Sequence, residues 1–192
     1  MREFKIDTFD PHLMEVLNIS GSIWPNNFYT LVELAALYRA ASTVDNNSTL
    51  VEIGICGGRS SSVLFQVAKE TSSKLILIDP WIYETPLCEP VFKRVADFFA
   101  DVPYIHYRRK SEDIPHLIPN NIDFLHIDGD HQAKSVEQDC RMYLPKLKAG
   151  HLCAFHDYGD ERYMGVSEEI ERTTKGWEDL GLFGRLKIKR KP

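Results

Sequence analysis

The feature that most constrains the fold is an alternation of short apolar runs with stretches of helical spacing. The apolar runs are TLVEIGI at 49–55, KLILIDPW at 74–81, IDFLHIDGD at 122–130 and HLCAFHDY at 151–158, with YIHYRR at 104–109 as a further candidate strand. Three runs are nearly continuous in apolar residues, as parallel strands buried on both faces require. The sequence therefore predicts a doubly wound α/β fold, in which ligands bind at the carboxyl ends of the strands.

The segments between these runs have the spacing of amphipathic helices. Apolar residues predict helices over 29–41, about 60–70, 89–99, 132–143 and 166–173. No linker or internal repeat divides the 192 residues, so we expect one domain with helices on both faces of a mostly parallel sheet.

Charge and cysteine content narrow the function classes. Basic residues number 23 and acidic residues 28, and the net charge of −5 disfavours nucleic acid as a partner. No apolar stretch approaches the roughly 20 residues that span a bilayer, and we expect a cytoplasmic protein with no membrane partner. The four cysteines form no CxxC pair and are expected to be reduced, three in the core and Cys56 in a functional turn.

The strongest local motif is the run VEIGICGGRS at 51–60, a strand that enters glycines and then a helix with Ser60 as its cap. Glycines let backbone amides approach a ligand, and the N-terminus of the following helix favours an anionic group. Asp79 ends the next strand about 25 residues after Gly54, where doubly wound folds place an acidic residue against ribose hydroxyls. Each feature alone also fits an ordinary turn, but together they predict an adenosine ligand.

The form of the glycine motif indicates which kind of adenosine ligand fits. A dinucleotide fingerprint requires glycines at positions 54, 56 and 59, but the chain has Cys56 and Arg59, and Arg59 would crowd the contact between helix and strand. A small anionic end, such as the carboxylate of S-adenosylmethionine, fits better. A nicotinamide dinucleotide oxidoreductase is the rival class.

Several motifs taken together resemble class I S-adenosylmethionine-dependent methyltransferases. They are the glycine turn, Asp79, the strand IDFLHIDGDH, the helix ending LPKLKAG and the strand ending AFHDY. Within that superfamily the resemblance is greatest to methyltransferase family 24, a small O-methyltransferase-like group, over residues 48–175. It implies a single Rossmann-like domain whose seven-stranded sheet has the order 3-2-1-4-5-7-6, with the last strand antiparallel.

The resemblance also implies which residues hold S-adenosylmethionine. Its methionine part would be held by four residues at the end of the first strand: Glu52, Gly54, Gly57 and Gly58. Asp79 would hold the ribose hydroxyls, Trp81 would cover the adenine, and Ser111 with Glu112 would meet the adenine edge. Asp128, at the end of a later strand, would border both the cofactor and the methyl acceptor.

A second cluster combines histidines and carboxylates at the ends of two strands that the implied order makes neighbours. Asp128 and His131 follow one strand, and His156 and Asp157 follow the other. Metal-dependent catechol-type and macrolide O-methyltransferases, which this arrangement resembles, hold a divalent metal with carboxylates at these positions. Asp128 and Asp157 are therefore candidate metal ligands, although the histidine at 156 disfavours magnesium.

The same cluster also supplies a base, which methyl transfer to an alcohol or phenol requires. The catechol-type enzymes carry a lysine base three positions after the first metal carboxylate, and His131 stands at that position here. His156 is the second candidate. His126, inside a buried strand, is expected to be a hydrogen-bonded core residue, and Asp130 to cap the next helix.

Residues 1–47 are expected to form an N-terminal helical segment on the acceptor side, and residues 48–192 the cofactor-binding core. Trp24, Pro25, Phe28 and Tyr29 fit either a lid over the acceptor or the core. The lysine-rich KIKRK at 187–191 is expected to be a solvated edge strand.

We therefore expect an S-adenosylmethionine-dependent methyltransferase that acts on a hydroxyl of a small metabolite or sugar. A cofactor-binding protein without turnover is a further alternative. No readable motif identifies the acceptor, the methylated atom, the dependence on a metal or the oligomeric state, and a homo-oligomer is left open.

Overall fold

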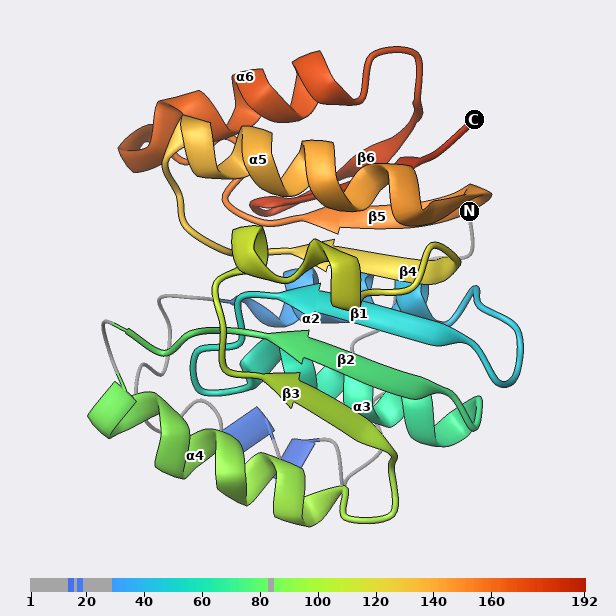
Figure 1. The fold of residues 1–192 in the computed structure, drawn as a ribbon, viewed down its shortest axis with the longest axis vertical. Coiled ribbons are helices and arrows are strands. Elements are labelled where there is room, and N and C mark those ends of the chain that lie inside the picture. The colour runs from blue at the N-terminus through green and yellow to red at the C-terminus, as the bar shows by residue number, and fades with distance from the viewer. Residues whose placement is uncertain (1–13, 16, 19–28, 83–84) are drawn as a thin grey trace.

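Seven strands form one sheet within the residues that the computed structural model describes, which are 14–15, 17–18, 29–82 and 85–192 (Figure 1). The strands are β1 (Thr49–Ile53), β2 (Lys74–Ile78), β3 (Tyr104–Tyr107), β4 (Ile122–Ile127), β5 (Leu147–Phe155), β6 (Glu178–Phe183) and β7 (Leu186–Arg190). Their order is β3-β2-β1-β4-β5-β7-β6. The first five strands are parallel, and β7 runs antiparallel to both of its neighbours. The expected order and the antiparallel last strand are confirmed.

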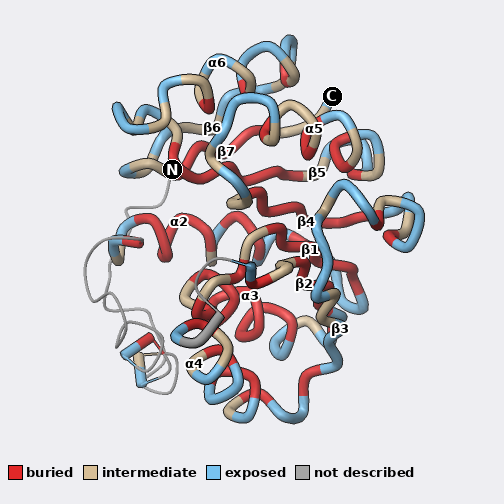
Figure 2. Tube along the Cα trace, turned by 60° about the vertical axis from the view of Figure 1, so that its left-hand side comes forward, coloured by how far each residue is buried: buried red, intermediate tan, exposed pale blue. Residues whose placement is uncertain are grey.

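Helices cover both faces of this sheet, as expected. They are α2 (Leu31–Ala41), α3 (Arg59–Glu70), α4 (Thr85–Phe98), α5 (Ala133–Tyr143) and α6 (Met164–Thr173). The buried side chains of α2, α3 and α4 belong to one apolar cluster, and those of α5 and α6 belong to a second. Side chains alternate along each central strand, so that Leu50 of β1 enters the first cluster and Val51 the second. The central strands are accordingly buried along their length (Figure 2).

The turn after β1 passes the end of β4 with no room for a side chain. Gly54 has φ of +86°, and a Cβ atom built there would lie 1.8 Å from the carbonyl oxygen of Asp128. The Asp128 amide donates to the carbonyl of Ile53 at 2.8 Å, and the Gly54 amide donates to the carbonyl of Ile78 at 2.9 Å. Gly54 therefore lets the ends of three strands come together at one edge of the sheet.

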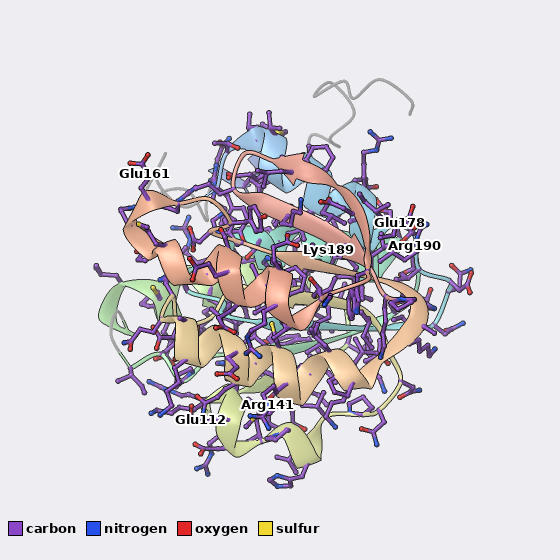
Figure 3. The ribbon with its side chains drawn as sticks, turned by 90° about the horizontal axis from the view of Figure 1, so that it is seen from above. Glu112, Arg141, Glu161, Glu178, Lys189 and Arg190 are labelled. Atoms are coloured by element: carbon purple, nitrogen blue, oxygen red, sulfur yellow. The ribbon has the colours of Figure 1, made fainter. Side chains whose placement is uncertain are left out.

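The C-terminal lysines are not on an edge strand, contrary to the expectation from their charge. β7 lies between β5 and β6, and Lys187 and Lys189 are 7% and 3% exposed. Their ammonium groups pair with Asp179 and Glu171 at the surface. Lys189 and its neighbour Arg190 are seen from above in Figure 3. Each lysine thus buries its aliphatic stem and brings its charge out to a carboxylate.

Two expected helix caps are also corrected. The N-cap of α3 is Gly58, and Ser60 lies within the first turn of the helix, where it is buried. Gln132 is the N-cap of α5, while Asp130 accepts a hydrogen bond from the hydroxyl of Ser135. Helix α4 starts at Thr85, before the start predicted at residue 89, and contains Pro90.

The cysteines lie where they were expected: Cys88, Cys140 and Cys153 are buried, and Cys56 lies in the glycine turn, with its Sγ 2.9 Å from the Sγ of Cys88. None of the helices in the described ranges combines the length and the apolar character that a bilayer crossing requires.

Replacing Gly54 by alanine should break the junction between β1 and β4. We expect Gly54→Ala to lower the free energy of unfolding by about 3 kcal/mol or more, since strain at positive φ adds to the clash with Asp128. Gly150→Ala is the matched control, because its φ is +78° with nothing within 4 Å of the added Cβ, and it should lose only about 1–2 kcal/mol. Urea denaturation of both variants measures the difference, and equal losses would contradict the close approach.

Candidate active site

The turn after β1 is fixed by Asp79 at the end of β2. Asp79 Oδ2 accepts hydrogen bonds from the backbone amides of Ile55 at 2.8 Å and Cys56 at 2.9 Å. Its Oδ1 accepts a hydrogen bond from the amide of Trp81 at 2.7 Å. Asp79 thus orients the backbone that the sequence assigns to S-adenosylmethionine. A contact between Asp79 and ribose stays a prediction.

The turn leads directly into the N-terminus of α3, which suits an anionic group. The backbone has positive φ at Gly54, Cys56 and Gly58, and Gly58 provides no side-chain cap for the helix. The N–H groups at the start of α3 can therefore donate hydrogen bonds to a ligand. This arrangement fits the carboxylate of S-adenosylmethionine.

Glu52 lies behind the turn, sealed from solvent. Its carboxylate accepts a hydrogen bond from the hydroxyl of Ser61 on α3, and its Oε1 lies 3.0 Å from His126 Nδ1. Glu52 and His126 are register partners on β1 and β4, and both are 0% exposed. His126 is thus confirmed as a buried, hydrogen-bonded residue, while a contact of Glu52 with the methionine part stays a prediction.

Tyr29 connects this pair to the end of β4. Its side chain is buried, its hydroxyl oxygen lies 2.9 Å from His126 Nε2, and the hydroxyl donates to Asp128 Oδ2 at 2.8 Å. Its ring stacks on His156, with 3.9 Å between the ring centroids. The sequence left Tyr29 open between lid and core, and the structure places it in the core beside the strand ends.

The other aromatic residues of that segment, Trp24 and Phe28, together with Pro25, lie outside the described residues. The assignment of residues 1–47 to the acceptor side stays a prediction.

His156 stands among three carboxylates. Its Nδ1 lies 3.2 Å from Asp128 Oδ1 and 3.4 Å from Asp157 Oδ2, and its Nε2 lies 3.7 Å from Glu33 Oε1. Burial lowers the pKa of this imidazole, but the negative charge of Asp128 and the nearby carboxylates of Asp157 and Glu33 raise the pKa to about 11. His156 is therefore a buried cation at neutral pH.

His131 is the more accessible of the two predicted histidines. Its Nε2 lies 2.9 Å from Asp157 Oδ2, its side chain is 36% exposed, and its ring stacks on Tyr163. Burial lowers the pKa of His131, but the hydrogen bond with Asp157 and the charges of Asp128, Asp157 and Asp130 outweigh this effect and raise the pKa above its ordinary value. The structure thus brings together the four residues that the sequence placed around the acceptor.

Two charged residues of this cluster were not found by sequence reasoning. Glu33, on α2, is 1% exposed and accepts the backbone amide of Arg185 at 2.7 Å. Arg185, between β6 and β7, also binds Asp157 at 3.1 Å and Asp160 at 2.8 Å. The spacing of Thr30 and Glu33 is a readable capping box, which the structure contains, but it does not reveal that Glu33 is buried.

Burial raises the pKa of Glu33, but the neighbouring His156 and hydrogen bonds from Thr30 and the Arg185 amide lower the pKa to about 2. The pKa of Asp157 is likewise lowered, because the hydrogen bonds and charges of His131 and His156 outweigh its burial. Both carboxylates are ionised at neutral pH.

The remaining predicted residues lie apart from this cluster. Trp81 is 8% exposed, donates from Nε1 to the carbonyl of Cys56 at 3.1 Å, and packs edge-on against His106. The Ser111 hydroxyl donates to Asp139 at 2.5 Å, and Glu112 lies at the surface beside α5, 3.7 Å from Lys110 (Figure 3). Contacts of these three residues with adenine stay predictions.

A metal ion is compatible with part of the cluster. Asp128, His131 and Asp157 each offer a ligand atom, and the three atoms lie within 4.8 Å of one another. Two carboxylates and one imidazole suit a borderline cation such as Mn²⁺ or Zn²⁺ better than Mg²⁺. Asp128 and Asp157 also bind Tyr29 and Arg185, so a metal ion would share both carboxylates with these donors.

Cavity volume alone does not identify the site. A cavity of about 520 Å³ lies between α5 and α6, with Arg141, Arg172 and Trp177 in its lining. The enclosed space beside Asp128, His131 and His156 is only about 10 Å³. The concentration of paired charges at the strand ends is what distinguishes the candidate site.

Comparison with known proteins gives one family. A family model described as "Methyltransferase domain" matches residues 51–158, which is more than half of the chain and runs from within β1 to just beyond β5. The "Uncharacterized protein R132" of Acanthamoeba polyphaga mimivirus is 32% identical over 157 residues, which are 76% of this chain and 65% of the relative. The chain therefore spans less than two thirds of the length of this relative.

Solved structures share the fold. The O-methyltransferase from Bacillus cereus, solved in complex with SAH, has a TM-score of 0.70 at 13% identity, covering 95% of this chain and 92% of that one. An rRNA methylase from Streptococcus thermophilus has a TM-score of 0.61 at 13% identity, covering 83% and 96%. At this identity the likeness concerns the fold alone.

Removing the buried charge of Glu33 should destabilise the protein in a pH-dependent way. We expect Glu33→Gln to lower the free energy of unfolding by about 3 kcal/mol at pH 7, because Arg185 and His156 lose a buried partner. Since the folded-state pKa is about 2 and the ordinary value is 4.5, this contribution is fully present above pH 4.5 and is lost as the pH falls towards 2. Urea titrations from pH 7 to pH 3 should therefore show a shrinking difference from wild type.

Glu112→Gln, at the exposed surface, is the control and should change stability by less than about 0.5 kcal/mol. A Glu33→Gln deficit that is as large at pH 3 as at pH 7 would mean that the charge of Glu33 is not what stabilises the fold.

Proposed function

The chain belongs to the methyltransferase domain family, and from this premise we propose that it transfers the methyl group of S-adenosylmethionine to a hydroxyl of a small metabolite or sugar. The family defines the enzyme class, an S-adenosylmethionine-dependent methyltransferase, EC 2.1.1.-. The dinucleotide oxidoreductase that the sequence left as a rival is thereby excluded. The hydroxyl acceptor and the residues that act on it are the proposed part.

The observation that carries the proposal is the pair formed by His131 and Asp157. His131 Nε2 lies 2.9 Å from Asp157 Oδ2, and its side chain is partly exposed at the same sheet edge as the glycine turn. With its proton on Nε2, the neutral ring keeps Nδ1 as a proton acceptor. Asp157 stabilises the imidazolium that forms when Nδ1 takes up a proton.

S-adenosylmethionine supplies a methyl carbon that the positive sulfur makes electrophilic. His131 accepts the acceptor's proton as the oxygen forms its bond to this carbon, and the carbon–sulfur bond breaks with its electron pair left on sulfur. Asp79 and Gly54 hold the cofactor turn, while Asp128 and His156 border the acceptor. Alignment of the two reactants at one sheet edge supplies much of the rate.

Asp128, His131 and Asp157 would hold a divalent cation, which would supply positive charge that lowers the pKa of a bound hydroxyl. His131 cannot be both a metal ligand through its free nitrogen and the base. The proposal assigns it to the base, because Arg185 and His156 already place positive charge beside Asp128 and Asp157.

The charge of the chain supports a small acceptor over a nucleic acid. The net charge of −5 gives no general attraction for a polyanion, and the candidate site adds several carboxylates to the sheet edge. The named activity of the Bacillus cereus relative, O-methylation, is consistent with a hydroxyl.

Substitution of His131 tests its role as the base. Transfer of a labelled methyl group from S-adenosylmethionine to a panel of catechols, phenols and hydroxylated sugars identifies an acceptor for wild type. We expect His131→Ala to lower kcat by about 10²–10⁴-fold on that acceptor, with SAH affinity within about 3-fold of wild type. His131→Lys should recover part of the rate, because lysine is also a base.

His116→Ala, on an exposed histidine outside the cluster, should leave the rate unchanged. An unchanged kcat for His131→Ala would contradict the proposed base. A wild-type protein that binds SAH but methylates no member of the panel would favour a binding protein without turnover.

A chelator separates the base from a metal. We expect the rate of methyl transfer and the calorimetric SAH affinity to be unchanged by EDTA to within about 2-fold, because neither the cofactor turn nor the base uses a metal ion. A rate that EDTA abolishes and Mn²⁺ or Zn²⁺ restores would instead assign His131, Asp128 and Asp157 to a metal centre.

A further inference from the structure

Tyr29 occupies a position between the two halves of the candidate site. It precedes α2 directly, and its hydroxyl contacts both His126, the partner of Glu52, and Asp128, the partner of His156. The residue is 4% exposed. A buried hydroxyl that meets two ionisable groups at 2.8 and 2.9 Å has its orientation set by both.

The direction of the hydrogen bonds follows from the number of protons. The Tyr29 hydroxyl carries one proton and donates it to Asp128 Oδ2. Its oxygen is then the acceptor for His126, so Nε2 of that ring carries a proton. On the other side of the ring, Nδ1 lies 3.0 Å from Glu52. The hydrogen bonds therefore run in one direction, from His126 through Tyr29 to Asp128.

Tyr29 also fixes the other partner of Asp128. Its ring is stacked on His156, with 21° between the planes, and His156 Nδ1 lies 3.2 Å from Asp128 Oδ1. Each oxygen of Asp128 thus faces a different donor, Tyr29 on one side and His156 on the other. Tyr29 touches both the carboxylate and the second donor.

The main chain at Tyr29 is anchored from the cofactor turn. Arg59, the first residue of α3, donates from Nε to the carbonyl of Tyr29 at 3.3 Å and from a terminal nitrogen to the carbonyl of Leu17 at 3.0 Å. The sequence treated Arg59 only as a departure from the dinucleotide pattern. Its contacts tie Leu17 and Tyr29, which both precede α2, to the turn assigned to S-adenosylmethionine.

We propose that Tyr29 is a positioning residue for methyl transfer, which holds Asp128 and His156 in the arrangement that borders the acceptor. The proposal rests on the proposed function, because it assigns a role within the same site. Tyr29 acts through its two partners and does not take part in proton transfer to the acceptor. The segment before α2 thereby contributes a residue that the acceptor side needs.

Tyr29→Phe tests the proposal, because it keeps the ring on His156 and removes only the hydroxyl. We expect kcat to fall by about 10–100-fold, as for other residues that orient groups touching the substrate, with KM for S-adenosylmethionine and SAH affinity within about 2-fold of wild type. Tyr38→Phe, on α2, is the matched control, because its hydroxyl bonds Glu70 at the surface, and its kcat should not change.

A double-mutant cycle with Asp128→Ala, which removes the acceptor of the Tyr29 hydroxyl, separates positioning from general stability. If Tyr29 acts through Asp128, Tyr29→Phe should cause less than about a 3-fold further loss of kcat in the Asp128→Ala background. Full additivity of the two losses in kcat, or a Tyr29→Phe variant that loses thermal stability while keeping wild-type kcat, would overturn the proposal.

A readout that needs no acceptor keeps this test separate from the proposed function. In the protein without any ligand, the imidazole ¹⁵N resonances of His126 and His156 should both shift in Tyr29→Phe, and neither should shift in Tyr38→Phe. Wild type that fails to bind SAH or to methylate any acceptor, while these resonances shift as expected, would refute the proposed function alone. Unshifted resonances would overturn the role of Tyr29.

Discussion

A charged side chain that is buried away from water needs an opposite charge or a hydrogen bond to compensate its lost hydration. This constraint determines how the residues at the carboxyl edge of the sheet are arranged. Glu33, Glu52 and Asp157 are each less than 5% exposed. An unpaired carboxylate in such a position destabilises a fold by several kcal/mol. Their partners come from other segments: His126 from β4, His156 from the end of β5 and Arg185 from the turn before β7. The sheet order that brings these segments together is therefore a condition for burying the carboxylates.

Asp128 links the two functional halves of this edge. Its carbonyl oxygen lies where any side chain at Gly54 would have to go, so the cofactor turn is pressed against the end of β4. Its carboxylate meets Tyr29 and His156 on the side assigned to the acceptor. Asp128 thus determines both the backbone path of the turn and the orientation of the charged cluster. A cofactor and an acceptor bound on either side of Asp128 would both be positioned by this one residue.

The parts of the fold that the sequence predicts are those governed by local patterns. Continuous apolar runs identify the central parallel strands, and the glycine turn with Asp79 identifies the edge where β1 and β2 end. The convergence of Asp128, His131, His156 and Asp157 follows from the strand order, which the family resemblance implies. These features depend on residues close in sequence or on a known topology.

The parts that escaped prediction depend on distant neighbours. Lysines 187 and 189 look like those of an exposed edge, and only the insertion of β7 between β5 and β6 explains their burial. The sequence around Glu33 indicates a capping box. No local pattern shows that Glu33 also accepts a hydrogen bond from the amide of Arg185, 152 residues further along the chain. Tyr29 reads equally as lid or core, because its two hydrogen-bond partners lie 97 and 99 residues away.

The hydrogen bond between Glu33 and the Arg185 amide makes the charged cluster depend on the last hairpin of the sheet. α2 stands ahead of every strand in the chain, whereas the turn that satisfies its buried carboxylate follows six of the seven strands described. Without the turn between β6 and β7, Glu33 would lack the hydrogen bond from the Arg185 amide. A chain with only its parallel strands in place would have the cofactor turn but an incomplete charged cluster. The complete cluster therefore requires the entire sheet.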